Sequence, residues 1–242
     1  MILNRASARP SVMPSHSNPF QLLVFDWDGT LMDSIGTIVA CTEATLSELE
    51  LGELPEATIR GTIGLGLRET IEILSPGCDE ALYGRILECF RRHWVSTYRD
   101  MPLLFNGVGD VLRELAEEGY LLAVATGKSR RGLDYALTQT GLRDFFQATR
   151  TVDEAFSKPH PQMLLDILDD LGVKSEAALM IGDTTYDLEM ARSARTPSLG
   201  VCTGSHRREE LDRFAPLACL EGVVELPLWL ANRPAQVVAG RP

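Results

Sequence analysis

The segment LLVFDWDGTLMDS, residues 22–34, constrains the fold of this chain more than any other stretch. Its first four residues are apolar, and a short apolar run that ends in a turn signal is typical of a strand in the buried centre of a parallel sheet. Asp26 and Asp28 follow directly. Two carboxylates this close repel each other, and burial strengthens the repulsion, so a shared proton or a nearby cation is expected beside them. The sequence therefore predicts a central strand that ends in a charged site.

Apolar runs and helical patterns alternate after Pro102. Further strands are expected at 120–125, 146–149, 178–181 and 197–201, and helices at 108–118, 130–140, 160–171 and 185–195. Strands that alternate with helices build a parallel sheet with crossover helices. We therefore expect an α/β fold with a Rossmann-like parallel sheet, followed by a short strand and a packing helix between residues 215 and 230.

The stretch between the first two strands has a different, all-helical pattern. One stripe of apolar residues begins after Ser34, the expected N-cap, and a second places apolar or aromatic residues at every fourth position from Leu82 to Tyr98, after Asp79. The glycine-rich segment 59–70 lacks the strand that precedes a dinucleotide-binding loop, so we predict a plain loop there. The predicted domains are a disordered tail at 1–19, an α/β core at 20–34 and 101–232, a helical cap inserted after the first strand at 35–100, and a frayed C-terminus at 233–242.

Composition excludes several classes of partner. The formal net charge of −11 argues against nonspecific binding to nucleic acid or to anionic membranes. No apolar stretch approaches the roughly 18 to 20 residues that a membrane span needs. The five cysteines are scattered and form no CxxC pair, which is typical of a reduced cytoplasmic protein. We expect a small-molecule partner, and both a monomer and a homodimer stay open.

Polar residues follow the predicted strands or lie in the neighbouring loops at four places. They are, in chain order, Asp26 with Asp28, Thr126, Lys158, and Asp183 with Asp187. The carboxyl ends of parallel strands meet at one edge of the sheet, where ligands of such folds bind. Clustered acids repel unless a divalent cation lies among them, and Mg²⁺ typically takes one or two carboxylates together with substrate phosphate and water. The set therefore points to phosphoryl transfer with Mg²⁺.

Several of these residues suit steps of that reaction. Asp26 can attack phosphorus to form an aspartyl-phosphate, and Asp28 can protonate the leaving alcohol and then deprotonate the attacking water. Thr126 can hold phosphate oxygens together with backbone N–H groups near Trp27 and Gly127.

The remaining residues supply charge and order. Lys158 can neutralise both the nucleophile and the phosphate, Asp183 can complete the metal site, and Asp187 can orient metal-bound water or Lys158. Each residue also has a purely structural alternative. Asp-Gly is a common turn signal, the two later acids suit the start of a helix, and a lysine before proline can be an exposed loop residue.

The ordered segments FDWDGTLMDS, VATGKS, SKPHPQ and MIGDTTYD resemble the signatures of the haloacid dehalogenase-like superfamily of phosphohydrolases, in the subfamily with an inserted helical cap. The resemblance covers residues 22–201. It implies a Mg²⁺ site with Asp26 and Asp183 as side-chain ligands and Asp28 as a ligand through its backbone carbonyl. Dehalogenases of this kind lack the second aspartate, because a halide leaves without a proton, so Asp28 favours phosphate chemistry.

The segments DGTLMDS and IGLGLRET are similar to those of phosphoglycolate phosphatase and of pyrophosphatases with the same cap. Hexose phosphate mutases and a non-catalytic phosphate-binding module are the alternatives. Arg60, Arg68 and Lys128 are candidate contacts for a substrate carboxylate or a second phosphate, although solvated positions are an equal alternative. The chain departs from the family pattern at Trp27 and at Ala194-Arg195, and neither departure touches the proposed catalytic set.

Overall fold

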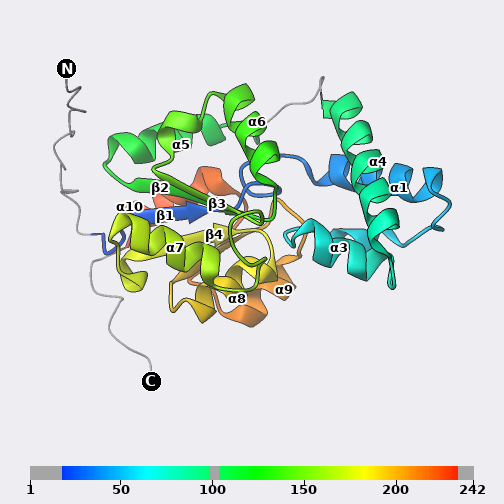
Figure 1. Cartoon of the computed structure of the whole chain (residues 1–242). Helices are drawn as coiled ribbons and strands as arrows, with labels where there is room; N and C mark the ends of the chain where they lie inside the picture. The colour runs from blue at the N-terminus through cyan, green and yellow to red at the C-terminus, as the bar shows by residue number, and fades with distance from the viewer. Residues whose placement is uncertain (1–17, 99–103, 234–242) are drawn as a thin grey trace, which may run out of the picture.

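The computed structural model describes residues 18–98 and 104–233, so most of the predicted tail (1–19) and C-terminus (233–242) lies outside the described residues. Its centre is a sheet of six parallel strands in the order β3-β2-β1-β4-β5-β6 (Figure 1). The strands are β1 (Leu22–Phe25), β2 (Leu121–Thr126), β3 (Ala148–Thr151), β4 (Ala178–Gly182), β5 (Ser198–Val201) and β6 (Cys219–Leu220). The parallel sheet confirms the predicted α/β fold.

Strand β1 lies in the middle of the sheet because its residues are apolar on both sides. All four are fully buried, with Leu23 and Phe25 in the hydrophobic core on one face and Leu22 and Val24 in the core on the other. Its last residue, Phe25, is in register with Val124 of β2 and Ile181 of β4. The three central strands therefore end at the same edge of the sheet.

Helices cover both faces of the sheet (Figure 1). The first core takes its helical side chains from α5 (Val108–Glu117), α6 (Arg130–Thr140) and α10 (Leu226–Ala231). The second takes them from α7 (Gln162–Leu171) and α8 (Thr185–Ser193). Apolar residues at three- and four-residue spacing on each helix, such as Val108, Val111, Leu112 and Leu115 of α5, supply these faces. Helix α9 (Arg208–Leu211) is short and follows β5.

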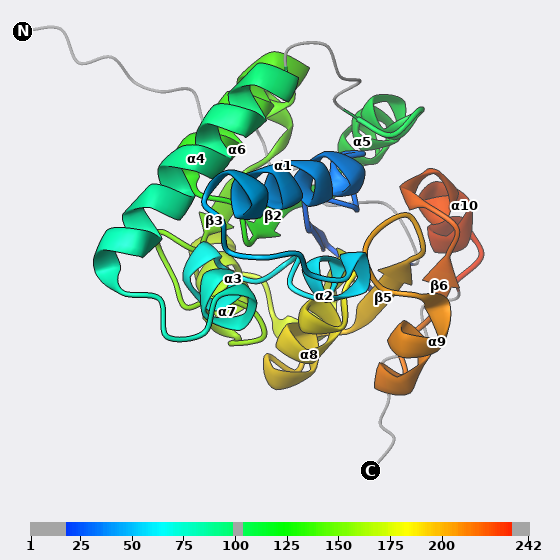
Figure 2. The same ribbon diagram turned by 90° about the vertical axis from the view of Figure 1, so that its right-hand side faces the viewer.

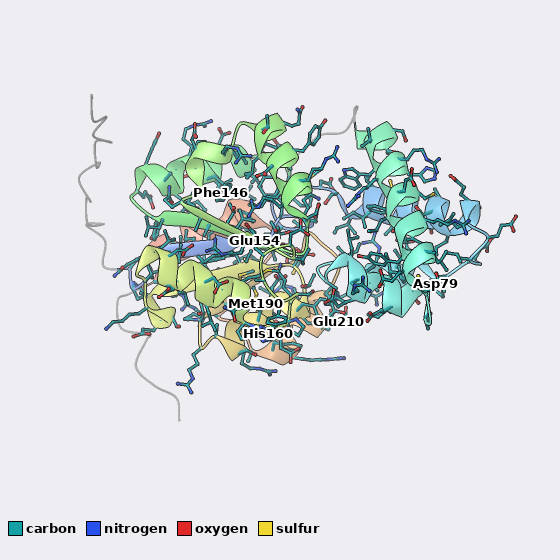
Figure 3. The ribbon with its side chains drawn as sticks, viewed as in Figure 1. Asp79, Phe146, Glu154, His160, Met190 and Glu210 are labelled. Atoms are coloured by element: carbon teal, nitrogen blue, oxygen red, sulfur yellow. The ribbon has the colours of Figure 1, made fainter. Side chains whose placement is uncertain are left out.

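The chain between β1 and α5 forms four helices, which we call the helical module (residues 35–98). They are α1 (Ile35–Glu48), α2 (Glu56–Arg60), α3 (Leu67–Leu74) and α4 (Glu80–Tyr98). The module lies beyond the carboxyl edge of the sheet in Figure 1, and Figure 2 views it face-on with α4 in front of α6. Asp79, labelled in Figure 3, precedes α4 and caps it as predicted, because its carboxylate accepts a hydrogen bond of 2.8 Å from the N–H of Leu82.

Two local predictions are wrong. The segment predicted as a loop at 59–70 contains the end of α2 and the start of α3, and only residues 61–66 connect them. Strand β3 begins two residues later than the predicted 146–149, because Phe146 packs edge-on against the ring of Trp27 (6.3 Å between centroids). Ser34 is the N-cap residue of α1, as predicted, but its hydroxyl makes no capping bond and donates to Asp28 instead.

The loop between α2 and α3 joins the helical module to the sheet domain. The hydroxyl of Tyr186 in α8 donates to the carbonyl of Gly61 (2.6 Å), and the N–H of Gly66 donates to Ser157 Oγ (2.7 Å). Loop 61–66 therefore lies against the segments that carry two of the predicted site residues, Asp187 and Lys158.

All five cysteines are free thiols, and the sequence pattern predicts no disulfide framework. Within residues 18–98 and 104–233, no helix has the length and apolarity to cross a bilayer.

Candidate active site

The centre of the site is a buried lysine between two buried aspartates. Lys158 Nζ lies 2.9 Å from Asp26 Oδ1 and 2.6 Å from Asp187 Oδ1, and all three side chains are almost completely buried. Asp187 is held in turn by Thr184, whose hydroxyl donates to Asp187 Oδ2 (2.7 Å) in a capping box at the start of α8. The helix cap and the ion pair thus fix the same carboxylate. The sequence predicted both roles for Asp187.

Asp183 lies beside this network, at the end of β4. The hydroxyl of Thr30 donates to its Oδ1 and the N–H of Ser205 donates to its Oδ2, both at 2.8 Å. A side chain on Gly29 or Gly204 would overlap the Asp183 carboxylate, so glycine leaves it the room it needs at both places. Thr30 and Ser205 were missed in the sequence: Thr30 belongs to the Asp-Gly-Thr motif, whereas Ser205 carries no local signal.

Burial makes these acids hard to ionise. Burial, reinforced by Asp187 and opposed by the Lys158 ammonium, raises the pKa of Asp26 from 3.8 to about 7. Burial, together with the charges of Asp26 and Asp187, raises the pKa of Asp183 well above its usual range. Burial alone would lower the pKa of Lys158, but Asp187 and Asp26 outweigh it and raise that pKa, so the ammonium stays charged.

The acid cluster suits a divalent cation. Asp26, Asp183 and Asp187 offer carboxylate oxygens that all lie within 4.8 Å of one another. Three buried carboxylates face one buried ammonium, so a cation would offset the excess negative charge. Within the described part of the chain, both oxygens of Asp183 accept only from neutral donors, Thr30 and Ser205, so Asp183 is the one of the three acids that no protein cation contacts. Oxygen ligands of this kind fit a hard cation.

Asp28 lies apart from that network and has its own partners. Lys128 Nζ is 2.9 Å and 2.8 Å from its two carboxylate oxygens, and the Ser34 hydroxyl donates to Oδ1 (2.7 Å). On its other side, Lys128 Nζ lies 4.9 Å from the ring centroid of Trp94 in α4, a cation–π distance. Lys128, a candidate substrate contact, therefore pairs with Asp28 and also contacts Trp94 of the helical module.

The predicted phosphate-binding groups lie around Asp26. Thr126 is buried at the end of β2, and its Oγ1 accepts a hydrogen bond from the N–H of Lys128 (3.2 Å). The N–H of Trp27 donates to Asp26 Oδ1 (2.6 Å), while its indole is buried beneath the loop. Gly127 approaches the helical module so closely that a Cβ there would lie 2.6 Å from the carbonyl oxygen of Leu65.

Two candidate residues are not brought to the site. Arg60 pairs with Glu56 (2.7 Å), and Arg68 pairs with Glu80 (3.0 Å), in both cases with exposed side chains. Neither arginine lines the cavity that lies between the helical module and the sheet.

A cavity of about 640 Å³ lies between the helical module and the carboxyl edge of the sheet. Asp26, Asp28, Thr126, Gly127 and Lys128 line the side that the sheet domain provides. The two predicted reacting aspartates, Thr126 and Gly127 thus face one space that a small molecule can occupy, whereas Trp27, Lys158 and Asp183 do not line it.

Comparisons with known proteins agree with this architecture. A family model described as haloacid dehalogenase-like hydrolase matches residues 23–201. The chain is similar to a phosphoglycolate phosphatase of Colwellia psychrerythraea, with 29% identity over 87% of this chain and 96% of the relative. It is also similar to the pyrophosphatase PpaX of Listeria innocua, with 32% identity over 84% of this chain and 93% of the relative.

A solved structure shares the whole fold. The crystal structure of a hydrolase from Pseudomonas syringae superposes with a TM-score of 0.79 at 24% identity, over 87% of this chain and 97% of that one. The resemblance noted in the four sequence segments is therefore confirmed over most of the chain, and this protein belongs to the haloacid dehalogenase-like hydrolase family.

Proposed function

We propose that this protein is a Mg²⁺-dependent phosphatase that hydrolyses a small phosphomonoester through an aspartyl-phosphate intermediate. The observation that carries the proposal is the setting of Asp26 at the wall of the cavity. Its Oδ1 accepts the N–H of Trp27 and pairs with Lys158 Nζ. Among the described residues, no hydrogen bond or ion pair engages Oδ2, so that oxygen is available for attack.

The first step transfers the phosphoryl group to the protein. Asp26 Oδ2 forms a bond to phosphorus while the bond from phosphorus to the leaving oxygen breaks, and Asp28 supplies the proton that the leaving alkoxide takes. The second step reverses the proton transfer. Asp28 accepts a proton from water, the water oxygen bonds to phosphorus, and the Asp26–phosphorus bond breaks to release inorganic phosphate and free carboxylate.

Other groups hold the phosphate during both steps. Lys158 supplies a fixed positive charge, and the Thr126 hydroxyl and the backbone N–H of Gly127 can donate to phosphate oxygens. Asp26 and Asp183 would hold the Mg²⁺, with Asp28 contributing its backbone carbonyl as the family resemblance implies. The ion would neutralise charge on the phosphate and let the neighbouring carboxylates ionise together.

The helical module would act as a lid over this site. Loop 61–66 contacts Tyr186 and Ser157 of the sheet domain and lies against Gly127, so opening it would separate the module from the phosphate-binding loops. Lids of this kind exclude water and select the substrate. Phosphoglycolate is the compound that the relationship to phosphoglycolate phosphatases suggests first, and it serves as a reference in the tests below. The five free cysteines support a cytoplasmic location.

Replacement of the nucleophile tests the proposal. Asp26→Asn should lower the Mg²⁺-dependent release of phosphate from an aryl phosphate by about 10⁴-fold or more. Asp33→Asn is the matched control, because Asp33 is an exposed acid in the same loop and should keep full activity. Thermal unfolding of both variants checks that they fold. Retained turnover in a folded Asp26→Asn protein would refute the assignment, and isomerised sugar phosphate with little free phosphate would indicate a mutase instead.

A further inference from the structure

The size of the cavity bears on the substrate. Its volume of about 640 Å³ is in the range of sites for drug-sized molecules, roughly 300 to 1,000 Å³. One water molecule occupies roughly 30 Å³ in the liquid. If each non-hydrogen atom of phosphoglycolate took the same volume, the compound would fill less than half of the cavity. A larger leaving group would occupy the space more completely.

The wall that the helical module provides is apolar. Helices α1, α3 and α4 each contribute aliphatic or aromatic side chains, among them Ile38, Leu46, Leu67, Ile71, Ile86 and Phe90. Among the described residues that line the cavity, the module supplies a single charged side chain, Arg91, and this residue is exposed. The leaving group of a bound phosphomonoester would therefore meet hydrocarbon over most of its surface.

The threonines in this wall add little hydrogen-bond donation. Thr42, Thr45, Thr62 and Thr70 also line the cavity. Each hydroxyl donates to a backbone carbonyl of the helical module, at distances from 2.7 to 3.3 Å. Their donors are thus used within the module, and a polar substrate would have few groups to bind there.

The carboxylate of phosphoglycolate would find an arginine partner in the cavity only at exposed positions. Arg60 and Arg68 pair with acids on the outer surface of the module, and Lys128 is engaged by Asp28. Arg91 and Arg131 line the cavity with exposed side chains. A carboxylate placed against an apolar wall without a partner pays a large desolvation cost.

Packing within the module does not account for all of these apolar side chains. The buried cluster of the module consists of Ile35, Val39, Ile59 and Ile63. Leu67 and Phe90 lie outside that cluster, are only half-buried, and border the cavity. Apolar groups left in contact with an open cavity gain free energy when an apolar ligand covers them.

We propose that the natural substrate is a phosphomonoester whose leaving alcohol carries an uncharged apolar body several carbons long. The phosphate would bind at Asp26 and Lys158, and the apolar body would lie along α1, α3 and α4. This inference rests on the proposed phosphatase function and specifies its substrate class.

A series of n-alkyl phosphates tests the proposal. Ethyl, butyl, hexyl and octyl phosphate share the same reacting bond and have alkoxide leaving groups of nearly equal basicity, so only burial of the chain changes. We expect kcat/KM to rise by about fourfold for each CH₂ group that becomes fully buried, until the cavity is filled, and hexyl phosphate to exceed phosphoglycolate. A flat or falling series, or a preference for phosphoglycolate, would overturn the inference and leave the phosphatase function standing. If the protein releases no phosphate from these compounds or from an aryl phosphate, the phosphatase function itself fails.

A pair of variants on one helix gives a second readout. Leu67→Arg places a cation in the wall, and should lower the ratio of kcat/KM for hexyl phosphate to that for phosphoglycolate by about tenfold or more. Ile73→Arg is the matched control, because Ile73 also lies on α3, is 50% exposed and does not line the cavity. Its ratio should stay unchanged. Equal ratios in the two folded variants would show that the α3 wall does not contact the leaving group.

Discussion

The raised pKa of Asp26 predicts how the stability of the metal-free protein changes with pH. The pKa is 3.8 in the unfolded chain and about 7 in the folded one, mainly because the carboxyl is buried. Between these values the folded protein binds more protons than the unfolded chain, so the free energy of unfolding falls as pH rises. At 1.36 kcal/mol for each pKa unit, the loss amounts to about 4 kcal/mol and is complete above pH 7.

Asp26→Asn isolates this contribution. The asparagine does not titrate, so the free energy of unfolding of the wild type minus that of the variant should fall by about 4 kcal/mol as pH rises through the window between the two values. Urea titrations at several pH values in EDTA measure it. Asp183, whose pKa is also raised, is present in both proteins. The part of this shift that burial and Asp187 cause cancels in the difference, whereas the part that the charge of Asp26 causes belongs to the effect of the substitution. A difference that does not change with pH would refute the reasoning from burial.

Mg²⁺ should offset much of this loss of stability. At one hundred times its dissociation constant, a ligand that binds only the folded state adds about 2.7 kcal/mol of stability. The gain should be largest at high pH, where protons no longer compete for the carboxylates, and Asp26→Asn should lose most of it. Asp33→Asn should retain it. Equal stabilisation of Asp26→Asn and wild type by Mg²⁺ would exclude Asp26 as a ligand.

Other substitutions test the packing around the site. Gly127→Ala should lower kcat/KM in steady-state kinetics with a small change in melting temperature. The new Cβ would push the carbonyl of Leu65 away from the loop that carries Gly127. Trp27→Ala should cost about 3 to 5 kcal/mol of stability in urea unfolding, because the ring is fully buried. Gly84→Ala should add about 0.5 to 1 kcal/mol in the same assay, since no atom obstructs a methyl group there and alanine favours helix. Tyr186→Phe removes the hydrogen bond to loop 61–66 and should cost about 1 kcal/mol.

The central strands could be predicted because burial and sequence agree there. Both faces of β1 are covered by helices, so an unbroken apolar run marks it, and its boundaries match those predicted. Strand β3 was misplaced because the apolar character of Phe146 serves a contact with Trp27, which only the folded chain brings near. An apolar residue indicates burial, but it does not say against which partner.

The short helices α2 and α3 of the module could not be predicted, for a different reason. Helix α2 has five residues and α3 has eight, so neither completes enough turns to show a periodic stripe. The glycines at 61, 64 and 66 between them are a stronger local signal, and they correctly mark the connection. The outer helices α1 and α4 are long enough for their periodicity to be visible.

The residue types of the site could be predicted, but their pairings could not. Strand order and loop length bring Lys158 between Asp26 and Asp187, and the sequence left open whether Asp187 orients metal-bound water or this lysine. The partners of Lys128 are Asp28 and Trp94, which are far from it in the chain. Such pairings depend on where the helical module lies against the sheet, and no local pattern encodes that position.

The ion pair between Lys128 and Asp28 has a consequence for the proton that Asp28 must donate. Lys128 Nζ contacts both carboxylate oxygens and the Ser34 hydroxyl donates to Oδ1, so a leaving oxygen has to displace the ammonium before it can reach Asp28. The contact therefore opposes the first step for alkyl phosphates, whose leaving groups need a proton. It has little effect on that step for an aryl phosphate with a weakly basic leaving group.

Lys128→Met should therefore change the two substrates unequally. Any loss of phosphate binding affects both, so it cancels in the ratio of single-turnover rates for an alkyl and an aryl phosphate. We expect that ratio to rise by about tenfold, equivalent to about 1.4 kcal/mol, the size of a modest contact to a charged group. Arg131→Met, which removes an exposed cation three residues further along the chain, should leave the ratio unchanged. A ratio that falls in Lys128→Met would mean that Lys128 assists proton donation, and the ion pair would then have to open before the alcohol leaves.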